Sequence, residues 1–321
     1  QINMGMYYGE ESGLPLYYRV YPGSISDKTH LKYMVADNEF INGKHTRFVM
    51  DRGFYSKENL QYLTQGGYRF VIALPGSLKF CQELVETHSA ELINHSEFRL
   101  GAGLPYGKSY ESTVLGFRMN IHLYYDPEKA LRETTALYEL LEAQENDLKL
   151  MEEPPEKKLH YDRFFHINRS KDGKLGFVRN YQAIDAALKS CGFFLIAETD
   201  FKKTTAEILD IYRRRDTIEK SFDDLKNELD MKRLRIHTSE TAQGKVFVSF
   251  LSLIVRSYLL KRLKDYMRRN GLTLRKILLE LDKIKTIQYP GSEDERLLNP
   301  LTKQQREIYE LLELPMPECR G

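Results

Sequence analysis

The sequence predicts a mixed α/β fold in which helices cover a sheet. Two runs rich in aromatic and β-branched residues, 2–8 and 15–21, are separated by GEESG, which predicts a β-hairpin. Two apolar strand-like segments then alternate with helix-like segments as far as residue 74. Because hairpins pair antiparallel whereas helix-linked strands favour parallel pairs, the combination predicts a mixed sheet.

The elements between the hairpin and residue 74 follow from local patterns. The turn GSISD leads into a helix expected from about Lys28 to Phe40. HTRFVMD predicts a strand that ends at Asp51, and Ser56 is the expected N-cap of a short helix over 56–65. The apolar run YRFVIAL then predicts the next strand.

A change of pattern between about Lys79 and Ser190 predicts an inserted or appended module. Short strand-like runs there surround one acidic helix, and the buried-strand pattern resumes only at CGFFLIAET. The strand-like runs are SYESTVL, FRMNIHLYY, RFFHINR and KLGFVRN, and the helix is DPEKALRETTALYELLEAQENDLKL. We therefore divide the chain into 1–78, 79–190, 191–270 and 271–321, the last being a helical tail.

Helices dominate the sequence after residue 203. The apolar spacing predicts one long helix from about Thr204 to Leu229 and a second from about Ser239 to Arg269. PLTKQQREIYELLEL predicts a further small helix in the tail.

Composition excludes several classes of protein. The cysteines Cys81, Cys191 and Cys319 are too few and too widely spaced for a disulfide framework or a thiolate zinc site. They favour a reducing compartment, and we expect the cytoplasm. No run approaches the roughly 18 consecutive apolar residues of a membrane helix, so no membrane partner is expected.

Charge is segregated along the chain although the whole is nearly balanced, with 48 Lys or Arg against 46 Asp or Glu. Residues 201–270 hold 17 basic and 10 acidic residues, whereas 128–158 hold 5 basic and 9 acidic ones. A basic segment of this kind is a weak pointer to a polyanion bound by one face.

The predicted helix that ends near Leu229 sorts its charges into faces. At about 100° per residue, Arg215, Glu219 and Lys226 fall on one stripe about 60° wide with Tyr212. An adjacent stripe is apolar: Ile211, Ile218, Phe222, Leu225 and Leu229. Asp216, Asp223 and Asp224 are expected to point away from the charged stripe, largely to solvent.

The charged stripe permits two interpretations. A carboxylate among cations suits coordination of a divalent ion while its neighbours hold phosphates of a polyanion. The alternative is an amphipathic helix stabilised by i,i+4 ion pairs such as Arg215–Glu219. The geometry of the stripe leaves both open.

The spacing Tyr212-x2-Arg215-x3-Glu219-x6-Lys226 resembles the Y-R-E-K signature of a large group of bacterial insertion-sequence transposases with a DDE active site. The order of the surrounding segments is similar as well. GLPLYYRVYPGSISD resembles the segment after the second strand of these enzymes, FVMDRGFYS their second catalytic Asp region, and GFFLIAETD the strand before the catalytic Glu helix. The resemblance spans roughly residues 1–260.

The resemblance implies a ribonuclease H-like core, whose two parts are 1–78 and 191–270, interrupted by a β-rich insertion at 79–190. It implies that Asp51 is the second catalytic Asp and Glu219 the catalytic Glu, and that both hold two Mg²⁺ or Mn²⁺ ions together with a first Asp. Three other residues are implied to contact the transposon end: Tyr212, Arg215 and Lys226. The expected partners are the double-stranded DNA of terminal inverted repeats and of the target, bound by a homodimer.

The family's first Asp lies on a strand upstream of the segment that Gln1 begins. We therefore expect this chain to start inside the fold, to bind metal weakly and to cut DNA poorly or not at all. The second hypothesis is a catalytically inactive remnant that only binds DNA. A third is a glycosidase with Asp51 and Glu219 as its acid pair, which the nearby Arg215 and Lys226 disfavour.

Two further assignments stay open in the sequence. Asp51 is either a metal ligand or a cap for the next helix, and Ser56 is the better cap. The basic run Lys232, Arg233 and Arg235 is either a track that neutralises DNA phosphates or a solvated surface.

Overall fold

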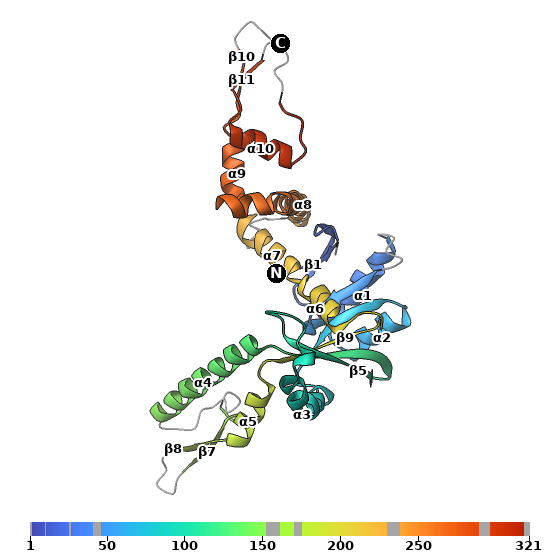
Figure 1. Cartoon of the computed structure of the whole chain (residues 1–321), viewed down its shortest axis with the longest axis vertical. Helices are drawn as coiled ribbons and strands as arrows, with labels where there is room; N and C mark the ends of the chain where they lie inside the picture. Colours follow the sequence, from blue (N-terminus) through green and yellow to red (C-terminus); the bar gives the residue numbers. More distant parts are fainter. Residues whose placement is uncertain are drawn as a thin grey trace. The chain divides into compact units, whose positions relative to one another are not determined.

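The computed structural model divides the chain into two compact units, whose elements are labelled in Figure 1. The sheet unit comprises Ile25–Arg213, and the split unit combines Gln1–Ser24 with Arg214–Gly321. The structure describes residues 2–9, 11–25, 27–40, 46–151, 161–169, 175–229, 238–288 and 296–317.

A five-stranded sheet with the order β3-β4-β9-β6-β5 forms the centre of the sheet unit. Strands β3 and β4 are parallel, and the other neighbouring pairs are antiparallel. The predicted mixed α/β fold is confirmed. The strands are β3 (Arg47–Met50), β4 (Arg69–Leu74), β5 (Tyr106–Val114), β6 (Phe117–Tyr125) and β9 (Phe193–Glu198).

Helices pack against this sheet. Helix α6 places Ile208, Leu209 and Ile211 against Val71 of β4 and Ile196 of β9. Helix α3 packs against β5 and β6. Strand β4 contacts both α6 and α2 and is largely buried, which explains why its run Phe70–Leu74 is apolar throughout. The helical segments are α1 (Asp27–Phe40), η1 (Arg52–Phe54), α2 (Lys57–Gln65), α3 (Lys79–Asn94), η2 (Ser96–Phe98) and α6 (Thr205–Arg213).

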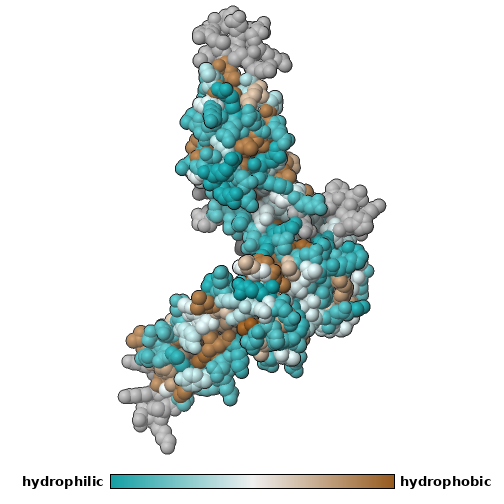
Figure 2. All heavy atoms as spheres, in the orientation of Figure 1, coloured by the Kyte–Doolittle hydropathy of each residue, from teal (hydrophilic) through white to brown (hydrophobic). Residues whose placement is uncertain are grey.

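The segment 126–190 of the sheet unit has a core of its own. It contains α4 (Pro127–Leu150), β7 (Phe165–Arg169), β8 (Leu175–Arg179) and α5 (Tyr181–Ser190). Leu141, Leu148, Phe164, Phe165 and Ile184 are buried together there, and Figure 2 shows hydrophobic residues between α4 and the β7–β8 pair. Strands β5 and β6, which also lie within 79–190, pair in the central sheet. The domain limits at 78 and 190 stay predictions.

The split unit joins the two ends of the described sequence. Strands β1 (Ile2–Tyr8) and β2 (Pro15–Pro22) form the predicted hairpin. Met6 of β1 is buried with Leu225, Phe250 and Leu253. The ring centroids of Tyr18 and Phe250 lie 4.6 Å apart. The hairpin therefore packs on the helices α7 (Asp216–Asp223), η4 (Asp224–Glu228) and α8 (Ser239–Asn270).

A second apolar cluster holds the tail of the split unit together. Leu263 and Tyr266 of α8 pack with Ile277 of α9 and Ile308 of α10. Helix α8 ends at Asn270 and is followed by Gly271, whose φ of 61° gives the left-handed conformation that favours glycine after a helix. The predicted tail helix is confirmed. The tail elements are α9 (Leu274–Leu281), β10 (Thr286–Gln288), β11 (Arg296–Leu298) and α10 (Lys303–Leu311).

The prediction of one continuous helix from Thr204 to Leu229 is wrong. Helix α6 ends at Arg213, and α7 begins at Asp216 after a turn in which the Ile218 N–H donates to the Arg215 carbonyl at 2.8 Å. The charges suit this break, because Arg213 lies in the last turn of α6, whereas Asp216 and Glu219 lie in the first turn of α7. Cations are stabilised at helix C-termini and carboxylates at N-termini.

The single charged stripe expected from that continuous helix stays a prediction. Tyr212 belongs to the sheet unit, whereas Arg215, Glu219 and Lys226 belong to the split unit, and Lys226 lies on the π-helical segment η4, which departs from a rotation of 100° per residue. The exposed Asp216 and Asp223 confirm the expectation of solvated side chains. Asp224 contradicts it, because its carboxylate lies 2.9 Å from the Arg256 guanidinium of α8.

None of the described helices is both long and apolar enough to cross a membrane.

Candidate active site

Asp51 directly follows β3, at the carboxyl end of a parallel strand pair. Ligands of open α/β sheets bind outside the carboxyl ends of the strands, so this position is suited to a functional side chain. The carboxylate is half-buried and caps the short 3₁₀ turn η1, with its Oδ1 accepting the Gly53 N–H at 2.7 Å. Its orientation is therefore fixed by local backbone.

Two nearby residues, Gly53 and Ser56, bear on the role of Asp51. A Cβ at Gly53 would lie 2.9 Å from Asp51 Oδ1, which is closer than side-chain atoms tolerate. The Ser56 hydroxyl accepts the Asn59 N–H at 3.1 Å and caps α2, as the sequence predicts. Asp51 thus caps η1, whereas Ser56 caps α2. The role of Asp51 as a metal ligand stays a prediction.

Tyr212 lies in the same unit as Asp51. It is half-buried near the end of α6 and packs against the buried apolar cluster of the sheet unit, against which Val49, two residues before Asp51, also packs. The structure therefore brings the helix that carries Tyr212 against the strand that leads to Asp51.

The remaining signature residues belong to the split unit. Arg215 Nη2 lies 2.9 Å from Glu219 Oε1, and the Glu219 side chain is 62 % exposed. The i,i+4 ion pair that the sequence offers as an alternative interpretation is thus present. Lys226 is exposed on η4. Because Asp51 and Glu219 belong to different units, their convergence stays a prediction.

Three predicted phosphate-binding residues fall in the segment 230–237, which lies outside the described residues: Lys232, Arg233 and Arg235.

The donor chemistry of Asp51 and Glu219 fits a hard divalent cation. Carboxylate oxygens are the ligands that Mg²⁺ and Mn²⁺ prefer. Within the described ranges, no three His, Cys, Asp or Glu side chains gather in a group that would hold a metal ion. The fit therefore rests on two carboxylates, each contributed by a separate unit.

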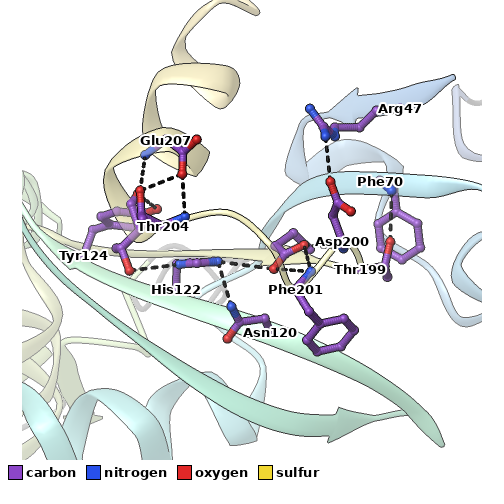
Figure 3. Close-up of polar contacts among 12 residues, drawn as sticks. Arg47, Phe70, Asn120, His122, Tyr124, Thr199, Asp200, Phe201, Thr204 and Glu207 are labelled. Carbon is purple, nitrogen blue, oxygen red and sulfur yellow. Dashed lines mark hydrogen bonds and ion pairs between the residues drawn. The ribbon is translucent and has the colours of Figure 1, made fainter. Parts of the chain in front are cut away.

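The sheet unit also contains a buried polar cluster that the sequence analysis missed, formed by Asn120, His122, Tyr124, Glu198 and Thr205. The side chains of His122 and Glu198 are fully buried, and His122 Nε2 lies 3.7 Å from Glu198 Oε1. His122 Nδ1 lies 3.2 Å from Thr205 Oγ1, at the start of α6. Figure 3 shows the His122 ring beside Asn120, whose Nδ2 lies 3.3 Å from His122 Nε2.

Hydrogen bonds lower the pKa of Glu198 in this cluster. Burial alone would raise the pKa of Glu198, but the nearby His122 ring and hydrogen bonds from the backbone N–H groups of Phe201 and Asp200 outweigh it. The pKa of Glu198 is thereby held below its usual value. Burial raises the pKa of the Tyr124 hydroxyl, which donates to the Thr205 carbonyl at 2.8 Å.

The connection between β9 and α6 is anchored at further points, as Figure 3 shows. Asp200 lies 2.7 Å from the Arg47 guanidinium and 3.3 Å from that of Arg69. The Glu207 carboxylate accepts the Thr204 N–H at 2.8 Å, while the Glu207 N–H donates to the Thr204 hydroxyl at 3.3 Å. This reciprocal pair is a capping box at the N-terminus of α6.

One signal in the sequence could have revealed the cluster. In β6 the apolar Met119, Ile121 and Leu123 alternate with the more polar Asn120, His122 and Tyr124, so one face of a central strand is polar. On the neighbouring strand, Glu198 is the one charged residue of β9.

Comparison with known families places the chain. The model of the transposase DDE domain matches residues 1–255, which include Asp51 and the four signature residues from Tyr212 to Lys226. No curated protein matches the chain. Because the family match covers more than half of the 321 residues, the chain belongs to the transposase DDE domain family.

Proposed function

We propose that this transposase cuts DNA strands at the ends of an insertion sequence and joins them to target DNA, with Asp51 and Glu219 as metal ligands. The observation that carries the proposal is the family match over residues 1–255, which contains both carboxylates and the complete Y-R-E-K spacing. The local fixing of Asp51 by the Gly53 N–H supports it, because a ligand must be held in place before the metal arrives.

Two Mg²⁺ or Mn²⁺ ions, when bound, would stabilise charge on the attacking and the leaving oxygen of a phosphodiester displacement. The protein supplies carboxylate oxygens and holds them in place. Asp51 is oriented by the backbone of η1, and Glu219 by the Arg215 guanidinium 2.9 Å away. The third carboxylate expected for the family has no residue assigned to it in this chain.

The basic and aromatic residues of the signature are proposed to grip the DNA. Arg215 and Lys226 would contact phosphates of the terminal inverted repeat, and Tyr212 would contact the same end. Three residues would extend the phosphate track: Lys232, Arg233 and Arg235. Because two ends are cut and joined together, a homodimer on DNA is proposed, acting in the cytoplasm.

Strand cleavage by the full-length protein tests the proposal. A duplex that carries the element's end should be nicked with Mg²⁺ or Mn²⁺ and left intact with a chelator. Asp51→Asn and Glu219→Gln should each abolish nicking while retaining DNA binding. Asp223→Asn is the matched control, because Asp223 is exposed on the same helix as Glu219.

Two outcomes would contradict this function. If Glu219→Gln cut as fast as the parent, the metal-ligand assignment would be wrong. If the parent bound the element's end but never cut it with either ion, the chain would be a DNA-binding remnant without chemistry.

A further inference from the structure

We propose that the buried polar cluster sets the position of α6 on the sheet, so that Glu198 and His122 act as positioning residues for strand cleavage. The inference rests on the proposed function, because it concerns the placement of Tyr212 relative to the strand of Asp51. Neither Glu198 nor His122 is proposed to touch DNA or metal.

The contacts of the cluster converge on one short connection. Glu198, the last residue of β9, accepts the backbone N–H groups of Asp200 and Phe201. His122 and Tyr124 of β6 reach the side chain and the carbonyl of Thr205, the first residue of α6. The two ends of the β9–α6 connection are thus tied to adjacent strands of the sheet.

The backbone of this connection needs such support. Phe201 has a φ of 54°, in the left-handed region that L side chains rarely adopt. Its N–H lies 3.0 and 3.1 Å from the two Glu198 carboxylate oxygens. A strained conformation persists only where surrounding contacts determine it, and Glu198 supplies those contacts.

Stability alone does not explain the polar residues at these positions. Buried ionisable groups are often no more stabilising than well-packed apolar residues of similar volume. The side chains of His122 and Glu198 have no solvent-exposed area, and the buried neighbours Ile196 and Ala197 of β9 would equally suit an apolar core. Hydrogen bonds are directional, so those made by Glu198 and Tyr124 hold specific backbone atoms of the connection in place.

A displacement of Thr205 would also displace Tyr212, because both residues lie on α6. A helix rises about 1.5 Å per residue, so Tyr212 lies about 10 Å along α6 from Thr205. Ile208, Leu209 and Ile211 are buried between them, so we expect this short helix to shift on the sheet as one piece. A small rotation at Thr205 would therefore shift Tyr212 relative to β3, the strand that contacts α6 and leads to Asp51.

The chain contains no tryptophan, which permits a direct test. Tyr212→Trp places a single indole at the end of α6 and serves for fluorescence only. Adding Glu198→Gln or Tyr124→Phe should shift its emission to longer wavelength and increase its quenching by acrylamide. The matched control is Gln305→Leu, which removes a buried hydrogen bond to the Glu280 carbonyl in the split unit.

The second part of the test measures cleavage kinetics in the protein that keeps its native Tyr212. Glu198→Gln and Tyr124→Phe should each lower the strand-cleavage rate at saturating protein by at least about tenfold, since small misplacements near a reacting centre have large effects. The dissociation constant for the element's end should change by less than about twofold, a pattern that a loss of binding would not produce. Gln305→Leu should cut at the parent rate.

The outcomes separate the two proposals. Unchanged indole emission together with unchanged cleavage in folded Glu198→Gln and Tyr124→Phe would overturn the positioning role. If Glu198→Gln fails to fold, Tyr124→Phe decides, because it removes one hydroxyl and keeps the ring. If Asp51→Asn still cuts, the metal-ligand assignment fails, while the fluorescence arm still judges the positioning of α6.

Discussion

The backbone nitrogen of Gly53 lies 2.7 Å from Asp51 Oδ1, and a Cβ at Gly53 would lie 2.9 Å from the same oxygen. Gly53 thus donates the hydrogen bond that orients the Asp51 carboxylate, and its lack of a side chain leaves room for that carboxylate. The position of Asp51 depends on the absence of a side chain two residues away.

Gly53→Ala should displace the Asp51 carboxylate and lower metal-dependent strand cleavage by about tenfold or more, because the proposed metal ligand leaves its oriented position. The unfolding free energy should change by less than about 1 kcal/mol, since a flexible side chain can move aside. Gly76→Ala is the control, because no atom lies within 4 Å of its added Cβ. Equal cleavage by both variants would show that the Asp51 carboxylate does not need this geometry.

Lys226→Ala should weaken binding of the element's end and reduce the slope of log affinity against log salt by about one, as expected for one lost phosphate contact. Binding titrations at several salt concentrations measure the slope. Lys220→Ala is the control, because Lys220 is exposed on α7 but lies outside the signature. An unchanged slope for Lys226→Ala would count against its phosphate contact.

Asp224→Asn should destabilise the protein by about 1–2 kcal/mol, because it removes a charge from a partly buried pair with Arg256. The adjacent Asp223 is exposed, so Asp223→Asn should stay within about 0.5 kcal/mol of the parent. Urea unfolding of the two variants measures the difference. Equal destabilisation would mean that the Asp224–Arg256 contact contributes nothing to stability.

Glu207→Gln should make the protein less stable at neutral pH and remove part of its acid sensitivity. Hydrogen bonds from the Thr204 backbone and hydroxyl, together with Lys203, lower the pKa of Glu207 from 4.5 to about 2. A depressed folded-state pKa gives stability that is present above pH 4.5 and is lost as the pH falls towards 2. The parent and the variant should therefore converge in unfolding midpoint across that range, and a constant gap would contradict the capping role.

Local sequence patterns were sufficient for several elements. The hairpin follows from two aromatic runs and a glycine-containing turn, and Ser56 is recognisable as an N-cap from its residue type and place. The end of β3 at Met50, directly before Asp51, follows from an apolar run that stops at a charged residue. These features depend on residues close together in the chain.

Features that depend on distant residues escaped prediction. Asp224 looks like a solvent-facing residue until α8 brings Arg256 to it. Glu198 and His122 meet only because β6 and β9 pair with Asn120 opposite Glu198, a register that neither strand reveals alone. The break at Arg214–Arg215 escaped because the apolar spacing continues across it, while the terminal charges that favour two separate helices do not alter that spacing.

The two parts of the split unit are translated at different times, because the whole sheet unit lies between them in the sequence. Tyr8 contacts Ser257, which lies 249 positions later, whereas the sheet unit is one uninterrupted stretch from Ile25 to Arg213. A nascent polypeptide leaves the ribosome amino end first, so the hairpin emerges long before the helices that bury Met6 and Tyr18 have been translated. Until α8 has been translated, Met6 and Tyr18 lack the α8 side chains that bury them in the folded protein. We expect chaperones that bind apolar nascent segments to bind the hairpin during that interval.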